Sequence, residues 1–537
     1  MGRISRREFN RLAAAAGALT LAPLRRARAQ VRFVNDPFQL GVASGDPSAD
    51  GFVIWTRLAP EPFDAGFLGQ VIYELDWEVA EDATFARIVK QGTAWARPHL
   101  AHSVRAVVDG LEAGREYFYR FRVGRYESPT GRALTCPAAD AGVASLKFAF
   151  CSCAHYEQGF FSAYRWMAED RPDLIFELGD YIYEDAWGAR RVRQFNTLEA
   201  VTLQDYRHRY TQYRTDPDLQ AAHAVCPWLV TWDDHEVDND YAGLTGEHGL
   251  CGGEAVRESF AARRAAAYQA WYEHMPVRPS RLLPGMGVQI YGSLDWGTLA
   301  RFYVLDTRQF RSPQVCPNPP TLERCDYERG RKILFGGAGG GAYVSSEQSP
   351  CREALADPSR TMLGADQERW LDGALAASRA AWNVVAQNVM VNAVVEGTTG
   401  SPKIFTDSWG GYPPARERFF ASLLKHRVAN PVVLTGDIHS FWACELANAA
   451  GRPAGVEFVV SSIATATTDK SDVLPLNPGA KWHDGNHNGY MRCEMTRDRL
   501  RTEAVGIDDR ADPRSGRSVL AAFDVRAGDP HVHRVDG

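Results

Sequence analysis

The sequence shows no marked excess of charge of one sign. Its 537 residues include 60 Lys and Arg against 66 Asp and Glu, which gives a net charge of −6. Proteins that bind the nucleic acid backbone need clustered cations to neutralise its phosphates. The charge balance therefore gives no reason to expect a stable nucleic acid complex.

Two sequence motifs of common enzyme classes are also missing. The chain contains neither the Gly-x-Ser-x-Gly turn of serine hydrolases nor the Gly-x-x-x-x-Gly-Lys-Ser/Thr loop of nucleoside triphosphatases. This argues against serine acyl chemistry and against nucleoside triphosphate binding.

Long apolar runs are absent after the first thirty residues. No later segment reaches the roughly 20 apolar residues that span a bilayer. We therefore expect no integral membrane segment in the mature chain. With 45% hydrophobic residues the chain can still bury at least one large core.

Residues 1–29 differ in kind from the rest. Arg6-Arg7 precede an apolar stretch from Leu12 to Leu24, and Ala27-Arg28-Ala29 follows it. This order is typical of a twin-arginine signal peptide. We predict cleavage after Ala29, export by the twin-arginine machinery and a periplasmic or extracellular location; a retained N-terminal anchor is the alternative.

Cysteine is scarce but not absent, since the chain has ten. That number is compatible with an oxidising compartment. Cys316, Cys325 and Cys351 lie in a loop-like region and are candidates for a disulfide. Their pairing stays open.

Residues 38–136 show short alternating runs separated by turn residues, which predicts a small N-terminal β-sandwich. The segment from Gly110 to Arg122 resembles the corner and following strand of a fibronectin type III-like domain. We place the N-terminal domain at 38–136.

From residue 145 to 505, strand-like runs alternate with helix-like stretches, which predicts an α/β domain. The predicted helices are 159–169 and 365–380, and a C-terminal tail is predicted over 506–537. The predicted strands are 146–150, 174–178, 229–232, 299–305, 382–386 and 432–435. The Pro-rich, Cys-bearing stretch 312–359 is predicted to be an insertion, and we hypothesise a surface lid there.

Four predicted strands are followed at once by residues that bind metals. These residues stand in Cys151-Ser152-Cys153, Gly179-Asp180-Tyr181-Ile182-Tyr183, Asp233-Asp234-His235 and Asp437-Ile438-His439. Ligands of α/β sheets bind beyond the carboxyl ends of the strands. One such segment alone would be read as a helix cap or a solvated turn. Four in one domain concentrate carboxylates that repel unless cations neutralise them, which predicts a metal cluster.

These segments, in this order, resemble the PhoD-like alkaline phosphatase/phosphodiesterase family of the metallophosphatase superfamily, over about residues 38–490. The likeness rests on the twin-arginine signal, the small β domain, Ser152-Cys153, Gly179 to Glu184, Trp232 to Glu236, Asp306-Thr307-Arg308 and Thr435 to Ser440. It implies a four-layer α/β/β/α metallophosphatase-like sandwich domain with a small N-terminal all-β (fibronectin type III-like) domain.

The resemblance also implies a metal set. Iron(III), Fe(3+), would be held by Cys153, Asp180, Tyr183 and His439. Calcium, Ca(2+), would be bound by Asp234 and Asp437, with Asp180 bridging the two metals. Thiolate, phenolate and imidazole ligands suit a transition metal, and carboxylate oxygens suit calcium.

Two further residues are implied to act on the substrate. His235 matches the position whose imidazole contacts the phosphate and the leaving-group oxygen, so we expect it to stabilise the transition state. Arg308 has a guanidinium that suits bidentate contact with phosphate oxygens. The alternative for Arg308 is a structural ion pair with Asp306 or another neighbour.

The chain departs from the family pattern after Cys153. Family members often carry Gln there, whereas Ala154-His155 follows here, so His155 is either an extra substrate contact or without a role. Cys151 would share a strand face with Cys153; we favour Cys151 as a buried small residue. Asn388 is predicted to be a satisfied polar residue in preference to a ligand.

The predicted function is a secreted, metal-dependent phosphoesterase that hydrolyses phosphate monoesters, diesters or both by attack of a metal-bound hydroxide on phosphorus. One alternative is a purple-acid-phosphatase-like enzyme, disfavoured because Ser152-Cys153 replaces an Asp-x-His motif. Another is a secreted binding protein with a degenerate metallophosphatase domain, disfavoured by intact ligand-type residues at all four strand ends.

Overall fold

The structure is a computed structural model that describes residues 31–188, 190–246, 253–283, 287–316, 342–345, 351–398 and 401–535. The predicted signal peptide lies outside the described residues, as does most of the predicted lid. Among the described residues, no helix is long and apolar enough to cross a membrane.

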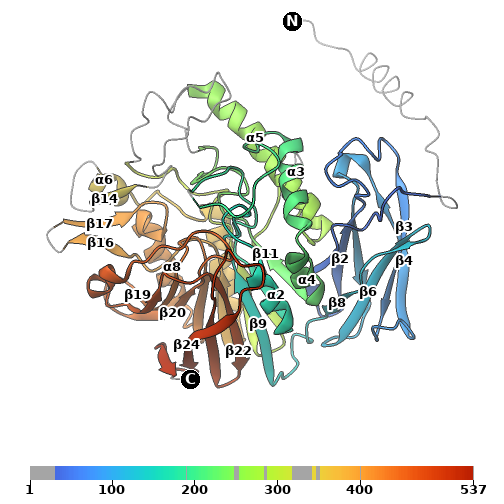
Figure 1. Cartoon of the computed structure of the whole chain (residues 1–537). Helices are drawn as coiled ribbons and strands as arrows, with labels where there is room; N and C mark the ends of the chain where they lie inside the picture. Colours follow the sequence, from blue (N-terminus) through green and yellow to red (C-terminus); the bar gives the residue numbers. More distant parts are fainter. Residues whose placement is uncertain are drawn as a thin grey trace, which may run out of the picture.

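A ten-stranded sheet forms the larger of two central sheets (Figure 1). In spatial order its strands are β25 (His533–Val535), β24 (Arg517–Arg526), β23 (Arg499–Ile507), β22 (Gly489–Thr496), β9 (Ser145–Cys151), β10 (Leu174–Glu177), β11 (Pro227–Val230), β1 (Val42–Ser48), β2 (Gly51–Arg57) and β5 (Ser103–Asp109). The neighbours β9, β10 and β11 are parallel. Every residue of β10 and β11 is buried, as expected of parallel strands covered on both faces.

A seven-stranded sheet packs against the first. Its order is β12 (Gly292–Trp296), β13 (Ala300–Val304), β15 (Trp382–Ala386), β18 (Pro431–Thr435), β20 (Pro453–Val459), β19 (Phe441–Ala447) and β21 (Ala480–Asp484). The ring of Phe302 on β13 lies 5.7 Å from that of Phe148 on β9 and 4.8 Å from that of Phe176 on β10. These apolar contacts join the two sheets in one core.

Helices cover the outer faces of both sheets. The first group is α2 (Ser162–Glu169), α3 (Leu203–Arg214), α4 (Pro217–Val225) and α5 (Gly253–His274). Tyr164 of α2 packs 6.0 Å from Trp228 of β11. On the seven-stranded sheet, α7 (Gly364–Ala377) and α8 (Pro413–Lys425) share a separate cluster with Tyr303 and Val385.

Two helix starts are explained by local sequence. Thr202 caps α3 in a capping box with Asp205, and Asp216 caps α4 just before a Pro at the first helical position. The predicted helices 159–169 and 365–380 correspond to α2 and α7.

The N-terminal part also contains a five-stranded sheet of its own. Its strands are β3 (Tyr73–Ala80), β4 (Ile88–Ala96), β6 (Glu116–Val123), β7 (Tyr126–Glu127) and β8 (Gly131–Leu134). The opposing layer, β1, β2 and β5, belongs to the ten-stranded sheet, because β1 pairs in parallel with β11 through Ser44 and Pro227. The predicted boundary near residue 136 therefore does not interrupt this sheet.

The prediction of a C-terminal tail over 506–537 is wrong. Strand β23 runs past residue 505, and β24 and β25 pair behind it in the ten-stranded sheet. Phe523 and Val525 alternate with polar neighbours and are buried in the main core. The end of the described chain is thus part of the fold.

The predicted insertion is described only in part. It contributes β14 (Tyr343–Ser345), which joins β17 (Ser401–Phe405) and β16 (Val395–Thr398) in a small sheet, and α6 (Cys351–Leu355). A disulfide joins Cys316 and Cys351, which confirms two of the three candidates. Cys325 lies outside the described residues.

Candidate metal centre

The carboxyl ends of parallel strands from both sheets meet at one place. Cys153, Asp180 and Asp234 follow β9, β10 and β11 of the ten-stranded sheet. Arg308 follows β13, and Asp437 and His439 follow β18, both of the seven-stranded sheet. Because the two sheets are packed face to face, their loops deliver these side chains to a shared space.

Four residues at this place have strained backbones. The φ angles are 60° at Cys153, 55° at Asp180, 71° at Asp437 and 53° at His439. Residues with a Cβ rarely adopt positive φ, and such strain persists at functional sites where the surroundings enforce it. Each of these residues stands in a segment singled out by its place after a predicted strand, and the family resemblance implied that it is a ligand.

Gly179 lets two of the loops come together. Its φ is +102°, and a Cβ added there would lie only 2.4 Å from Asp233 N. Glu236 then ties the loops: its carboxylate accepts backbone N–H groups from Asp180 at 3.0 Å, Tyr181 at 2.6 Å and Asp233 at 2.7 Å. The close approach of backbone to backbone fixes where Asp180 points.

The first ligand group contains Cys153, Asp180 and His439, whose donor atoms all lie within 4.8 Å of one another. The Tyr183 hydroxyl joins them, because it donates to Asp180 Oδ2 at 2.9 Å and lies 3.2 Å from His439 Nε2. The four predicted iron ligands are therefore neighbours in the structure.

Burial shifts the pKa values of this group. Burial, with Asp180 nearby, raises the pKa of the Cys153 thiol and of the Tyr183 phenol well above their usual values. Burial and His235 lower the pKa of His439 to about 3. A cation would favour the thiolate and phenolate and would release their protons on binding.

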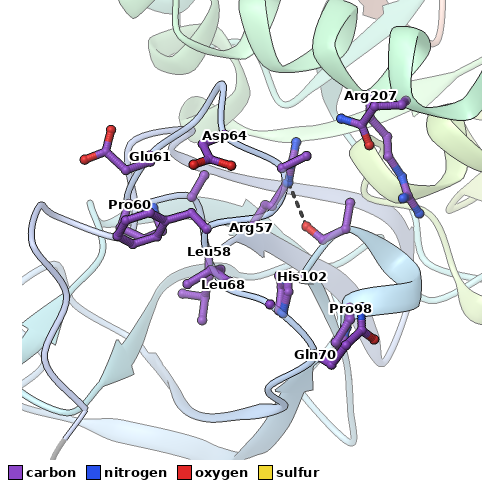
Figure 2. A pocket seen from close by; sticks show the side chains of 16 residues that line it. Arg57, Leu58, Pro60, Glu61, Asp64, Leu68, Gln70, Pro98, His102 and Arg207 are labelled. Carbon is purple, nitrogen blue, oxygen red and sulfur yellow. Dashed lines mark hydrogen bonds between the residues drawn. The ribbon is translucent and has the colours of Figure 1, made fainter.

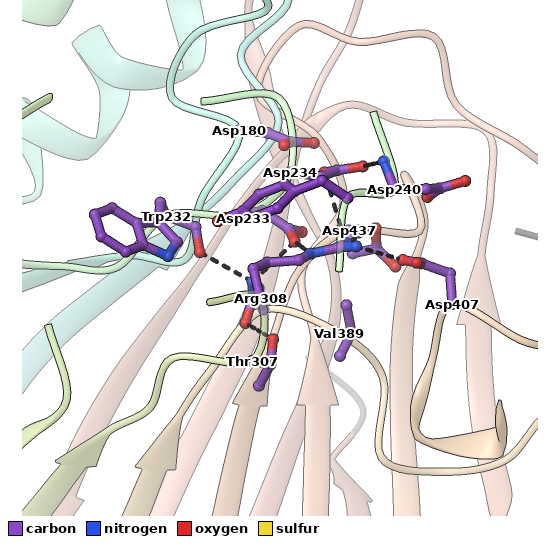
Figure 3. Close-up of polar contacts among 12 residues, drawn as sticks. Asp180, Trp232, Asp233, Asp234, Asp240, Thr307, Arg308, Val389, Asp407 and Asp437 are labelled. Atoms are coloured by element: carbon purple, nitrogen blue, oxygen red, sulfur yellow. Dashed lines mark hydrogen bonds and ion pairs between the residues drawn. The ribbon is translucent and has the colours of Figure 1, made fainter. Parts of the chain in front are cut away.

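The second group contains Asp233, Asp234 and Asp437, again with donor atoms within 4.8 Å (Figure 3). Asp233 Oδ2 and Asp437 Oδ2 are buried and have no hydrogen-bond partner within the described parts of the chain. Burial raises the pKa of Asp437 well above its usual range and that of Asp233 to about 6. Buried carboxylate oxygens without protein partners are ligands that a cation such as calcium would suit.

Arg308 lies inside this carboxylate group (Figure 3). Its side chain is fully buried, its Nε pairs with Asp233, and its Nη1 lies 2.8 Å from Asp407 Oδ2. Its Nη2 is 3.6 Å from Asp234 and 3.7 Å from Asp437. The structural ion pair considered from sequence is thus present, with Asp233 and Asp407 as partners; Asp306 Oδ1 instead accepts the Arg308 backbone N–H at 3.1 Å.

His235 lies beside both groups and is held by a carboxylate. Its Nδ1 lies 2.7 Å from Glu184 Oε2, and its backbone N–H donates to Asp180 Oδ1 at 3.3 Å. Burial lowers the pKa of His235, but Glu184, Asp234 and Asp180 outweigh it and raise that pKa well above the usual value. His235 thus lies next to the cluster with its Nδ1 held by Glu184.

Three weaker predictions have clear outcomes. Asn388 is satisfied, since its Nδ2 donates to Trp232 O at 2.9 Å and to Asp233 Oδ1 at 2.8 Å. Cys151 is buried outside the cluster, with its Sγ 3.2 Å from Glu177 Oε2. His155 is fully buried, packed against Tyr183.

Sequence reasoning missed Asp233, Asp407, Glu184 and Glu236 as parts of the site. Asp233 and Glu236 stand inside a segment that was already singled out, and Glu184 ends another. Asp407 follows β17 of the small sheet, and no local signal in the sequence connects that strand with the metal cluster.

A separate cavity of about 150 Å³ lies between the N-terminal part and α3 (Figure 2). Arg57, His102 and Arg207 are among its lining residues. Arg57 already donates to Ala101 O at 2.8 Å and to Thr211 Oγ1 at 2.6 Å. This cavity contains none of the predicted site residues.

The chain is similar to known proteins in sequence and in fold. Residues 148–504 match the family described as PhoD-like phosphatase, and residues 25–137 match the N-terminal domain of PhoD-like phosphatase. Together the two matches cover both the N-terminal strands and the loops of the metal centre.

Individual proteins show the same similarity. Alkaline phosphatase D of Bacillus subtilis (strain 168) is 42% identical over 508 residues, which cover 91% of this chain and 81% of the relative. A solved structure titled "Structure of PhoD" superposes with a TM-score of 0.84 at 40% identity, covering 95% of this chain and 94% of the other.

Proposed function

Since the chain belongs to the PhoD-like phosphatase family and is a phosphoesterase, we propose that it hydrolyses phosphate monoesters, diesters or both at the metal centre described above. The observation that carries this proposal is the meeting of ligand-type side chains from the loops after β9, β10, β11 and β18. Small phosphate esters are the substrates that such a centre suits.

The donor sets support two kinds of metal. Cys153, Tyr183 and His439 offer a thiolate, a phenolate and an imidazole, which suit iron(III), and Asp180 would bridge to the second group. The carboxylates of Asp234 and Asp437 suit calcium. Bound there, the cations would supply Lewis acidity and make a nucleophile available at neutral pH.

His235 is proposed to act on the leaving group. Its Nδ1 is occupied by Glu184 at 2.7 Å, so Nε2 remains to face the substrate. Of the carboxylates that raise the pKa of His235, Glu184 lies outside the proposed ligand set and would favour the protonated ring with cations bound beside it. A protonated imidazole can donate a hydrogen bond, and then a proton, to the oxygen on which charge develops as the ester bond breaks.

Arg308 is proposed to balance charge. Its guanidinium is enclosed by four carboxylates and has no exposed surface. These surroundings favour a role in holding Asp233 and Asp234 ionised for a cation over direct contact with phosphate oxygens. Arg308 also lowers the pKa of Asp234 below its usual range although burial opposes it.

The proposal also includes export of the folded chain. Six cysteines of the described chain are free and buried: Cys136, Cys151, Cys153, Cys226, Cys444 and Cys493. Thiols shielded in this way fit twin-arginine export of a folded chain to the periplasm or beyond, with cleavage after Ala29.

The fold type is proposed as well. The helix-covered sheet pair supports a four-layer α/β/β/α sandwich, and the N-terminal strands support a fibronectin type III-like domain.

The test is metal analysis and hydrolysis on the same sample. Protein purified without added metal should contain iron, show the colour of phenolate-to-iron charge transfer and release nitrophenol from nitrophenyl phosphate or bis(nitrophenyl) phosphate. Comparison of the two substrates assigns monoester or diester preference. Correctly folded protein that stays colourless and inactive with iron and calcium supplied contradicts the proposal.

A further inference from the structure

His155 has no part in the chemistry proposed above, yet its side chain is fully buried beside the metal centre. Its ring centroid lies 4.5 Å from that of Tyr183, with 39° between the ring planes. The ring of His235 approaches the same phenol at 4.2 Å and 32°. Two imidazoles therefore flank Tyr183, and ring contacts of this kind restrict how the phenol can turn.

The polar atoms of His155 do not explain its burial. Its Nδ1 accepts the Glu157 backbone N–H at 3.3 Å, so the proton of the neutral ring lies on Nε2. Nε2 has no hydrogen-bond partner among the residues for which the structure gives positions. The side chain therefore acts through the faces and edges of its ring.

Trp187 completes the enclosure. Its ring meets that of His155 at 87° and 5.5 Å, an edge-to-face contact in which an electron-rich face can receive an N–H edge. The same indole lies nearly parallel to His439, at 16° and 6.1 Å, and 6.2 Å from Tyr183. The pair His155 and Trp187, here called the ring bracket, contacts two proposed iron ligands.

The backbone anchors the bracket to the same ligands. Thr465 Oγ1 accepts the His155 backbone N–H at 3.2 Å. That hydroxyl lies 2.7 Å from Cys153 O and 3.0 Å from the Tyr183 oxygen. The positions of Cys153, His155 and Tyr183 are thus fixed through one shared group.

We propose that His155 is a positioning residue of the metal centre, which fixes the Tyr183 ring so that its oxygen faces Asp180 and His439. The inference rests on the proposed function, because it assigns Tyr183 to the iron. It requires a flat ring at position 155 and does not require the imidazole proton.

The experiment compares His155→Leu, which removes the ring, with His155→Phe, which keeps it. Phe195→Leu is the matched control, since Phe195 packs 5.5 Å from His155 and takes no part in the proposed ligand set. For each iron-loaded protein we would measure the charge-transfer absorption band, the iron dissociation constant by chelator competition, kcat and KM.

We expect His155→Leu to shift the band and to weaken iron binding about 10- to 100-fold, the usual effect of losing a group that orients a ligand. Its kcat should fall with KM unchanged. His155→Phe should retain the band and affinity of the unaltered protein, and Phe195→Leu should lose thermal stability only. If His155→Leu does not fold, Trp187→Leu, at a partly exposed ring, should shift the band in its place.

A band and iron affinity unchanged in His155→Leu, or in Trp187→Leu where that variant replaces it, overturn the inference alone. Equal impairment of His155→Phe and His155→Leu also overturns it, because the ring shape would then not be the cause. Unaltered protein that binds no iron and shows no band overturns the proposed function and this inference with it.

Discussion

At the residue scale, the carboxylate of Glu184 favours the protonated form of His235. Glu184 lies 2.7 Å from His235 Nδ1 and is the foremost group that raises the pKa of His235 against burial. A proton donor of this kind is effective only while its partner is ionised and in place. The catalytic role proposed for His235 is therefore shared with Glu184.

Glu184→Gln should lower kcat on the order of 100-fold, because the amide keeps the shape but removes the charge that keeps His235 protonated. Metal content should not change, since Glu184 is outside the proposed ligand set. Steady-state kinetics and elemental analysis of the same preparation check both statements. Full activity, or loss of metal, would contradict the assignment.

Glu177, buried in β10, is a second carboxyl whose pKa can be tested, through the pH dependence of stability. Burial raises its pKa well above the usual value of 4.5, with Glu236 adding to the effect. A raised pKa means that the folded state holds a proton that the unfolded state has lost. Stability must then fall as pH rises from about 4.5 through the folded pKa.

Glu177→Gln should flatten this dependence: its unfolding free energy should decrease less than that of the unaltered protein between pH 5 and pH 9. Chemical denaturation at several pH values measures the slope. Glu503→Gln is the control, because arginines lower the pKa of Glu503 although burial opposes them, and its loss should not flatten the alkaline slope. Parallel slopes for Glu177→Gln and the unaltered protein would refute the explanation.

At the scale of elements, the loops after the strands carry the site, and their meeting depends on backbone geometry. The segments that contain Cys153, Asp180, Asp437 and His439 could be predicted from sequence because each follows an apolar run, and the family resemblance then singled out these four residues. Asp407 could not, because β17 belongs to a small separate sheet whose position is set by long-range packing. Arg308 was predicted as a site residue. Its enclosure by carboxylates could not be predicted, because loops of both sheets supply those carboxylates.

Gly179→Ala should separate the loops after β10 and β11, because its Cβ would lie 2.4 Å from Asp233 N at a φ of +102°. We expect a loss of about 1–3 kcal/mol in stability and a marked loss of metal. Gly373→Ala in α7 is the matched control; it has open space around it and should stabilise by about 1 kcal/mol. Thermal unfolding and metal analysis distinguish the two, and unchanged metal content in Gly179→Ala would count against the loop geometry.

At the scale of the whole molecule, one sheet joins the N-terminal, central and C-terminal parts of the chain. The sequence indicated the β-rich N-terminal part and the α/β region correctly. It did not reveal the pairing of β1 with β11, because Ser44 and Pro227 are far apart in the chain and carry no local signal of their contact. Residues 506–537 were predicted to be a tail for the same reason: the pairing of their strands in the sheet has no local signal in the sequence.

A chain that ends after Ile507 should fold poorly, because it loses β24 and β25 and exposes the edge of β23. Removal of Phe523 alone is expected to cost about 3–5 kcal/mol. A chain that ends after Gly528 keeps β24 and should remain soluble with a smaller decrease in Tm. Equal soluble yield and Tm for the shorter chain and the full chain would contradict the role given to these strands.

The central claim is that loops from two sheets hold one metal cluster that acts on phosphorus. Its most direct test is an anomalous difference map at the iron absorption edge, from crystals of protein purified without added metal. We predict a peak within bonding distance of Cys153 Sγ, the Asp180 carboxylate, the Tyr183 oxygen and the His439 imidazole. A map with no peak there, or with iron bound elsewhere, would contradict the account.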